Sequence, residues 1–329
     1  MTSLGEWVQD TFGLGEGPVT LTPVSRGAQG RISLLEVGAV SYALKQPFGT
    51  LDEEDIRREA GYLDHFAAAG VVVPVHIRDA TDHYVVEVPR GLGGGQARVT
   101  RWVQGRPVGN ATSALSAPLG ALLASLHVAA PPAESPMGPW YRTMPSAREW
   151  NDLLDLSVGA PWENALSKRL PDLVAHAQRI EAAGPPRGPL VIGHRDLHPD
   201  NVLVAADGTL RAIDWEDAGP TDTHRDIAKV LVQWHVEGAN VDTRGIAVTV
   251  EAYEAAGGPG RVQTLDDFTM VLCADTNFLA AQIRSALDPA LPAEHRAPTL
   301  AEIEQGLAVY VPTPAALDTV LAATLRATA

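Results

Sequence analysis

The segment Leu190–Gly219 constrains the fold of this chain more than any other stretch. It contains three short apolar runs with the composition of β-strands, and the turn pair Asp207-Gly208 separates the second run from the third. Polar residues stand where these runs begin or end, namely His194, Arg195, Asp196, Asn201 and Asp214. We therefore expect a β-hairpin with its polar groups gathered at the open end, and the rest of the chain to serve as scaffold and substrate platform.

The residues His194–Asn201 match the pattern H-R-D-x-x-x-x-N, which is the catalytic loop of protein kinases. Transfer of a γ-phosphoryl group needs a carboxylate that orients the acceptor hydroxyl and takes its proton, and Asp196 offers this group. Mg²⁺ prefers hard oxygen ligands, which Asn201 and Asp214 supply from either side of the predicted hairpin. The alternative is a structural turn whose Asp and Asn side chains cap nearby backbone groups.

The first hundred residues are predicted to be β-rich with one main helix. The runs Val19–Val24, Arg31–Val37 and Val40–Leu44 favour strands, and a turn containing Gly27, Gln29 and Gly30 joins the first two. Glycines in such a turn allow the backbone to approach a phosphate. Lys45 ends the third run, and Glu59 lies within a predicted helix over Leu51–Ala69. A strand lysine and a helix glutamate in these places can pair, or they can be unrelated surface charges.

After the linker at residues 104–107 the pattern becomes mainly helical. We therefore expect an α+β protein of two lobes: residues 1–103 form a nucleotide-binding lobe with an antiparallel sheet, and residues 104–329 form a mostly helical lobe. The second lobe would carry the catalytic loop, the metal site and the helices that bind the acceptor. The order glycine turn, Lys45, Glu59, linker, Asp196, Asn201, Asp214 agrees with a kinase-like arrangement.

Composition limits the partners of this chain. The formal net charge is −15 over 329 residues, which disfavours nucleic acid and anionic membranes as partners and favours cationic small molecules. The single cysteine, Cys273, excludes an internal disulfide and a cysteine-based zinc site. Because the chain shows neither a secretory signal nor a long apolar run, a cytoplasmic protein is expected.

The sequence resembles the aminoglycoside phosphotransferase family, within the wider protein-kinase-like fold. The resemblance rests on the catalytic-loop match and on Ile213-Asp214-Trp215-Glu216, which is similar to the family's metal motif and differs from the Asp-Phe-Gly of protein kinases. Only a few residues separate this motif from the next predicted helix, so an activation segment has no room. The family usually has glycine where Arg195 stands, and Arg195 is expected to pair with a nearby carboxylate.

The resemblance implies a role for each matching residue. Asp196 would be the catalytic base, in a loop with His194 and Arg195, and Asn201 and Asp214 would bind Mg²⁺. ATP or GTP would be the phosphoryl donor: Lys45 would hold its phosphates with Glu59 as partner, the turn at Gly27, Gln29 and Gly30 would cover it, and the backbone around Thr100, Trp102 and Val103 would hold its base.

The acceptor is expected to be a small hydroxyl compound that carries an amine, because many acids accompany the predicted catalytic loop. The candidate acceptor-binding residues are Glu216, Asp217, Asp266, Asp267, Asp275 and the loop residue Trp140. An aminoglycoside or another antibiotic is the favoured acceptor. The alternatives are a metabolic kinase acting on choline, ethanolamine, homoserine or a sugar, and a nucleotide-binding pseudokinase.

Overall fold

The computed structural model describes residues 2–26, 30–109 and 113–328 and divides into two compact units. The first unit is built from Met1–Arg106, Leu203–Asp207 and Arg211–Ala218, and the second from Pro107–Val202, Gly208–Leu210 and Gly219–Ala329. The division differs from the predicted one, because most of the predicted hairpin belongs with the N-terminal unit. The physical reason is contact with helix α2 (Glu53–Ala68): the ring of Trp215 lies 4.9 Å from that of Phe66, centroid to centroid.

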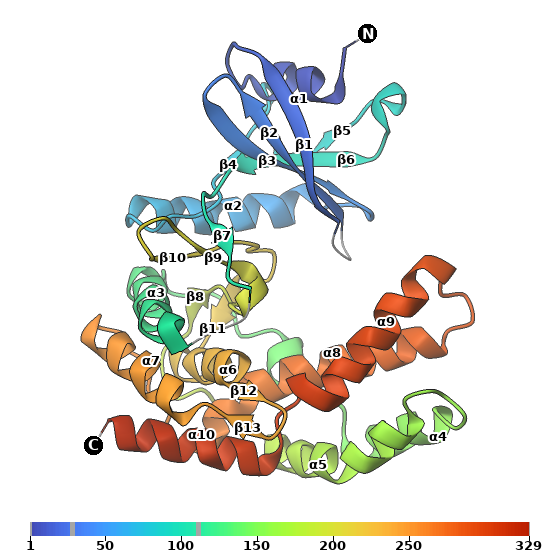
Figure 1. The fold of residues 1–329 in the computed structure, drawn as a ribbon, viewed down its shortest axis with the longest axis vertical. Helices are drawn as coiled ribbons and strands as arrows, with labels where there is room; N and C mark the ends of the chain where they lie inside the picture. The colour runs from blue at the N-terminus through green and yellow to red at the C-terminus, as the bar shows by residue number, and fades with distance from the viewer. Residues whose placement is uncertain (1, 27–29, 110–112, 329) are drawn as a thin grey trace. The chain divides into compact units, whose positions relative to one another are not determined.

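The first unit is organised around an antiparallel sheet (Figure 1). Its strand order is β1-β2-β3-β6-β4, and β5 also pairs with β6. The strands and helices of this unit are α1 (Leu4–Phe12), β1 (Val19–Arg26), β2 (Gly30–Val37), β3 (Val40–Pro47), α2 (Glu53–Ala68), β4 (His76–Ile77), β5 (Val86–Glu87) and β6 (Gln96–Arg101). The register between β3 and β6 sets Lys45 opposite Arg98. Two basic side chains therefore leave the sheet side by side.

Helix α1 was not among the predicted elements, and it completes the core of the first unit. A capping box starts it, in which Ser3 accepts from the backbone N–H of Glu6 while the Glu6 side chain accepts from that of Ser3. Val8 and Phe12 then pack against sheet residues that include Leu35. The helix thus covers apolar residues of the sheet that would otherwise face water.

The second unit is mainly helical, as predicted. Its helices are α3 (Ser116–Ala129), α4 (Ala147–Leu156), α5 (Glu163–Ala182), α6 (Thr223–His235), α7 (Thr243–Ala255), α8 (Thr269–Leu287), α9 (Ala293–Gln305) and α10 (Pro314–Ala327). Short strand pairs join β8 (Val191–Gly193) to β11 (Gly219–Thr221) and β12 (Val236–Glu237) to β13 (Asn240–Val241). A further small sheet has the order β10-β9-β7, formed by Leu210–Ala212, Val202–Val204 and Arg106–Pro107, and most of its residues belong to the first unit. Helix α9, which contains Pro298, was not among the predicted elements.

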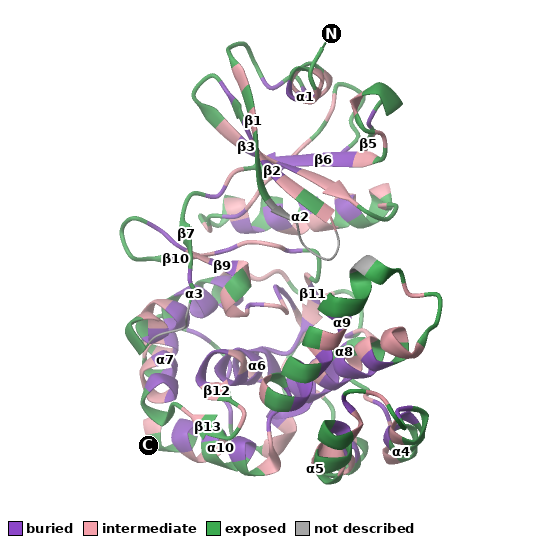
Figure 2. Ribbon diagram, turned by 45° about the vertical axis from the view of Figure 1, so that its right-hand side comes forward, coloured by how far each residue is buried: buried purple, intermediate pink, exposed green. Residues whose placement is uncertain are grey.

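Helix α6 is the most enclosed helix of this unit. Figure 2 shows it almost entirely in the buried colour, and buried positions include the charged residues Arg225, Asp226 and Lys229. Its N-cap is Asp222, which accepts from the N–H of His224. Charged side chains on such a helix need partners nearby, and the catalytic loop supplies one of them.

Within the described residues, no single helix has the length and apolar character of a membrane span. The helix pair His295–Tyr310 and Pro314–Ala327, bent by 52°, meets those two criteria only when taken together.

Two glycines give a direct test of the helix packing. A Cβ at Gly120 of α3 would lie 2.3 Å from the carbonyl oxygen of Thr249 on α7, whereas a Cβ at Gly61 of α2 would meet nothing within 4 Å. We expect Gly120→Ala to destabilise the protein by about 1–3 kcal/mol or more through overpacking. Gly61→Ala should stabilise it by about 0.5–1 kcal/mol, because alanine favours a helix interior. Denaturant unfolding of both variants measures this, and equal effects of the two would contradict the close α3–α7 contact.

Candidate active site

The predicted catalytic loop follows β8 and is anchored on three sides. His194 is buried, and its Nδ1 accepts from the backbone N–H of Asp196 at 3.3 Å. The indole N–H of Trp234 on α6 donates to the carbonyl of Leu197 at 2.7 Å. Gly193 lies so close to Thr221 that a Cβ there would be 2.4 Å from the threonine methyl. These contacts fix the backbone on either side of Asp196.

Arg195 has a left-handed backbone, with φ of 65°. Glycine adopts this conformation without strain, which gives a physical reason for the family's usual glycine at this position. The Arg195 guanidinium lies over the ring of Tyr141, with its Cζ 4.3 Å from the ring centroid, and it packs against Gly219. The side chain thus stacks on an aromatic residue, a contact that the sequence did not predict.

The Asp196 carboxylate is held through both of its oxygens. Lys229 Nζ lies 3.2 Å from Oδ1, and Asn201 Nδ2 donates to Oδ2 at 3.0 Å. His198 Nε2 lies 3.3 Å from Oδ2. Burial alone would raise the pKa of Asp196, but the His198 hydrogen bond and the Lys229 charge outweigh it and hold the pKa far below the ordinary range. Asp196 is therefore ionised at neutral pH and ready to accept a hydrogen bond from a hydroxyl.

The side-chain amide of Asn201 suits the predicted metal role. Its nitrogen donates to the main-chain oxygen and to Oδ2 of Asp196, both at 3.0 Å. Both N–H groups are thereby used, which leaves the amide oxygen as a hard ligand. The described residues contain no group of three or more His, Cys, Asp or Glu side chains that could hold a metal ion. Asn201 therefore stays a predicted Mg²⁺ ligand through its amide oxygen.

Asp214 belongs to the first unit, where it forms an ion pair with Lys45. Lys45 Nζ lies 2.8 Å from Asp214 Oδ1 and 3.1 Å from Glu216 Oε1. Like Arg195, Asp214 has a left-handed backbone, with φ of 60°. Non-glycine residues rarely adopt this conformation, and those that do are concentrated at functional sites. The pair already joins the predicted phosphate-binding lysine to a predicted metal ligand.

Arg98 forms the ion pair with Glu59 that was predicted for Lys45. Its side chain is 2% exposed, NH1 lies 2.8 Å from Glu59 Oε2, and NH2 bonds to Glu216. Glu59 also accepts from His76 Nε2 at 3.0 Å. The expected Lys45–Glu59 pair is therefore wrong for this structure. Arg98 lies opposite Lys45 in the sheet, and its permanently charged, multidentate guanidinium bridges the two carboxylates.

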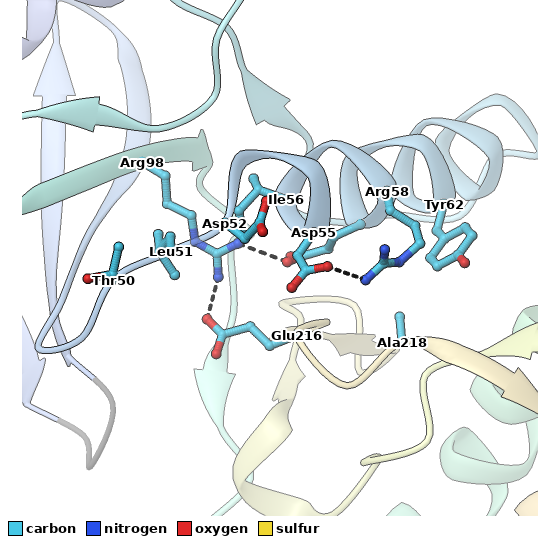
Figure 3. Close-up of a pocket in the computed structure, with 11 residues that line it drawn as sticks. Thr50, Leu51, Asp52, Asp55, Ile56, Arg58, Tyr62, Arg98, Glu216 and Ala218 are labelled. Carbon is cyan, nitrogen blue, oxygen red and sulfur yellow. Dashed lines mark hydrogen bonds and ion pairs between the residues drawn. The ribbon is translucent and has the colours of Figure 1, made fainter. Parts of the chain in front are cut away.

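A pocket of about 240 Å³ adjoins Arg98 within the first unit. Figure 3 shows Arg98 reaching toward Glu216, and Asp55 facing Arg58 along α2. These charges pair with one another, with Arg58 NH2 at 2.5 Å from Asp55 Oδ1. The charged side chains that line the pocket therefore favour neither a cationic nor an anionic ligand.

The predicted base-binding segment is only partly available for a ligand. Thr100 sits in the central strand β6, where its backbone faces Ala43 on one side and His76 on the other. The N–H of Trp102 donates to Ser41. The backbone of Thr100 thus lies within the sheet, and its role in holding the nucleotide base stays a prediction. The backbone of Val103 lies just beyond the strand, and the prediction is kept there.

Only one residue of the predicted glycine turn can be assessed, because Gly27 and Gln29 lie outside the described residues. Gly30 begins β2, and a Cβ there would lie 2.6 Å from the carbonyl oxygen of Gln46. Close approach of β2 to β3 therefore requires glycine at this position, whatever its role toward a phosphate.

The predicted acceptor-binding acids separate by their partners. Glu216 is bound by Lys45 and Arg98. Asp266 accepts from the N–H of Gly184, and Asp267 is buried against Arg187 and loop N–H groups. These three have partners that hold the local structure, and their role in acceptor binding stays a prediction. Asp217 is exposed, and it belongs to the first unit.

Asp275 differs from the other acids, because its Oδ2 is buried and has no hydrogen-bond partner among the described residues. Burial raises the pKa of Asp275 to about 7, with Lys229 lowering it and Asp196 raising it. It therefore lies within electrostatic range of the catalytic loop. Asn277, two residues along α8, donates to the carbonyl of Trp140 at 3.0 Å. The exposed Trp140 thus lies beside the same helix.

Three important residues were missed by the sequence reasoning: Arg98, Lys229 and His198. For Arg98 and Lys229 a signal existed, since each is a charged residue inside an otherwise apolar run, at Ala97–Val99 and Ile227–Val232. A charge in such a run is buried and requires a partner. His198 lies inside the catalytic motif, where its position was read as a spacer.

Comparison with known proteins identifies the family. The model of the Phosphotransferase enzyme family matches residues 20–265. The chain belongs to this family. The predicted membership of the aminoglycoside phosphotransferase family is thereby confirmed, and the chain is a small-molecule phosphotransferase that acts on hydroxyl groups.

Individual relatives agree with this membership. A homoserine kinase from Methylobacterium nodulans is 27% identical over 260 residues, which cover 77% of this chain and 76% of the relative. A spectinomycin phosphotransferase in complex with ADP and spectinomycin has a TM-score of 0.67 at 14% identity, with 97% of each chain covered. An amicoumacin kinase in complex with AMP-PNP and Ca²⁺ has a TM-score of 0.59 at 18% identity, covering 92% of this chain and 91% of that one. The predicted α+β kinase-like fold is confirmed.

The buried Glu59 predicts a pH-dependent contribution to stability. Burial alone would raise its pKa, but the His76 hydrogen bond and the Arg98 charge bring the pKa down to about 2 from 4.5. A depressed carboxyl pKa stabilises the fold above pH 4.5, and this stabilisation disappears as the pH falls toward 2. We expect Glu59→Gln to cost about 1–3 kcal/mol at pH 7 and progressively less below pH 4.5. Urea unfolding across this range tests it, and a pH-independent difference would contradict the assignment.

The proposed role of Asp196 predicts that its replacement abolishes phosphoryl transfer without weakening nucleotide binding. Asp196→Asn keeps the side-chain volume but removes the charge that orients the hydroxyl and takes its proton, so transfer should fall by about 100-fold or more. Nucleotide affinity should change little. Product formation and calorimetric nucleotide binding measure the two effects. Asp200→Asn is the matched control, because the Asp200 side chain is 93% exposed in the same loop. Survival of transfer in Asp196→Asn would rule out this role.

Proposed function

We propose that this protein transfers the γ-phosphoryl group of ATP, with Mg²⁺, to a hydroxyl of a small molecule that also carries an amine. An aminocyclitol or aminoglycoside antibiotic is the favoured acceptor. The observation that carries this proposal is the buried Oδ2 of Asp275, which has no hydrogen-bond partner in the described part of the chain and lies within electrostatic range of the ionised Asp196. An ammonium group would supply the missing partner and stabilise the charged form of Asp275.

The chain's own residues account for the proposed transfer. The acceptor oxygen forms a bond to the γ-phosphorus while the bond from that phosphorus to the leaving ADP oxygen breaks, and the hydroxyl proton passes to Asp196. Lys45 would hold the phosphates, and Asn201 and Asp214 would hold the magnesium. When bound, Mg²⁺ neutralises charge on the phosphates. The ADP in the complex of the spectinomycin phosphotransferase supports an adenine nucleotide as donor.

A second candidate acceptor is homoserine, favoured by the relative at 27% identity. Homoserine also carries an ammonium and a hydroxyl, so Asp275 suits either acceptor. The purified protein should be screened with Mg²⁺ and ATP or GTP against aminocyclitol and aminoglycoside antibiotics, homoserine, choline, ethanolamine and sugars, with product mass as the readout. Turnover of homoserine without turnover of any antibiotic would overturn the favoured proposal. Turnover of amine-free sugars alone would overturn the amine requirement.

Asp275 provides the test that is specific to the amine. We expect Asp275→Asn to raise the KM of an amine-bearing acceptor by about 10-fold or more, with an unchanged KM for ATP, because a buried ion pair is lost. Asp318→Asn is the matched control, since Asp318 is exposed on α10. The deaminated analogue of the same acceptor should show no difference between wild type and Asp275→Asn. An equal KM increase for both acceptors would argue against ion pairing.

Asp275→Asn should also change the pH dependence of kcat/KM. Because the pKa of Asp275 is about 7, its carboxyl is charged above this pH and neutral below it. The kcat/KM for an amine-bearing acceptor should therefore rise as the pH increases from 6 to 8 in the wild type, and this rise should be reduced in Asp275→Asn.

A further inference from the structure

Lys229 is a buried ammonium that no part of the proposed chemistry has yet used. It projects from the enclosed helix α6, its side chain is 2% exposed, and its Nζ lies 3.2 Å from Oδ1 of Asp196. Burying an ammonium is costly unless a charged or hydrogen-bonding partner compensates it. The partner here is the candidate catalytic base itself, whose side chain is 30% exposed and thus open to a ligand.

Among the described residues, the groups that contact the Asp196 carboxylate leave one of its acceptor positions open. A carboxylate has about four acceptor positions, two on each oxygen. Asn201 and His198 occupy Oδ2, and Lys229 occupies one position on Oδ1. The open position is therefore on Oδ1. A hydroxyl that binds there would share this oxygen with the Lys229 ammonium.

Lysine is rare in this chain, so its presence at position 229 requires an explanation. The chain has 25 lysine and arginine residues, of which only Lys45, Lys168 and Lys229 are lysines. Lys168 is exposed, while Lys45 and Lys229 each contact a candidate active-site carboxylate. Lysine presents a compact point charge, whereas arginine presents a wide planar fork. Lys229 approaches the single oxygen Oδ1 of Asp196, whereas Lys45 contacts one oxygen each of Asp214 and Glu216.

We propose that Lys229 is a positioning residue for phosphoryl transfer. Its ammonium holds Oδ1 of Asp196 so that the open position of this oxygen faces the acceptor hydroxyl. This inference rests on the proposed role of Asp196. It goes further in naming the oxygen that receives the hydroxyl and the residue that orients it. Orientation of this kind is the main contribution that a protein makes to phosphoryl transfer.

The competing explanation is that Lys229 only braces the loop on α6. Trp234 provides the comparison, because it also joins α6 to the loop through its bond to the Leu197 carbonyl, without carrying a charge. Replacing Trp234 by Phe removes its hydrogen bond to the loop carbonyl. The contacts of the Asp196 carboxylate with neighbouring side chains remain in place. If Lys229 only stabilised the loop, a Lys229 variant and Trp234→Phe that lose equal stability would also lose equal activity.

The kinetic experiment compares Lys229→Met, Lys229→Arg and Trp234→Phe, using the acceptor found in the screen and, alongside it, the hydrolysis of ATP. We expect Lys229→Met to lower kcat by about 10–100-fold, with KM for ATP within about 3-fold of wild type. Lys229→Arg should recover part of this kcat, because it restores the charge. Trp234→Phe should lower the melting temperature with a much smaller loss of kcat. A wild-type kcat in Lys229→Met, or a loss that matches Trp234→Phe at equal stability, would overturn the proposal.

A second measurement does not depend on activity. Selective ¹³C,¹⁵N labelling of lysine gives three side-chain signals in this chain, and Lys45→Arg and Lys168→Arg assign them. Asp196→Asn should move the Lys229 signal and leave the Lys168 signal in place; an unmoved Lys229 signal would overturn the contact. An inert wild type that still shows this shift would overturn the proposed function of the site but not the Lys229–Asp196 contact. Added acceptor should shift the Lys229 signal in the wild type, and binding without such a shift would overturn the sharing of Oδ1.

Discussion

A carboxylate that has lost most of its hydration stays ionised only if the protein replaces the lost water with donors and positive charge. Asp196 is in this situation, and His198, Asn201 and Lys229 provide the replacement. The loop geometry follows from it, since His194 and Trp234 must fix the backbone before those three side chains can converge. The enclosed character of α6 has the same origin, because a solvated Lys229 would interact only weakly with Asp196.

The first unit also contains a buried charge that neighbouring side chains compensate, and here the charged residue is an arginine. Arg98 carries a permanent charge into the sheet, and Glu59 and Glu216 neutralise it from α2 and from the segment after Asp214. This arrangement ties residues 211–218 to the N-terminal sheet, which is why the unit is not continuous in sequence. Lys45 is thereby left beside Asp214 and Glu216, where the binding of a nucleotide phosphate would compete for its charge.

The local parts of this architecture could be predicted, and the long-range pairings could not. Asp196, Asn201 and Asp214 lie in short motifs whose spacing carries the chemistry, and the strand and helix periodicities around Lys45 and Glu59 are strong. The partner of Glu59 depends on the register of β3 with β6, which no local pattern reveals. Likewise, five acids were equivalent candidates for acceptor binding, and only tertiary contacts separate Asp275 from Glu216, Asp266 and Asp267. Helices α1 and α9 were not among the predicted elements.

The scarcity of lysine has a practical consequence for handling this protein. Reagents that acylate or alkylate primary amines react with accessible side chains, and Lys168 on α5 is the exposed lysine of this chain. Lys229 is enclosed and Lys45 is only 20% exposed within an ion pair. A fluorophore or a surface linker introduced through amine chemistry would therefore attach mainly at Lys168 or at the amino terminus. Immobilisation of this kind would leave the charge of the catalytic loop intact.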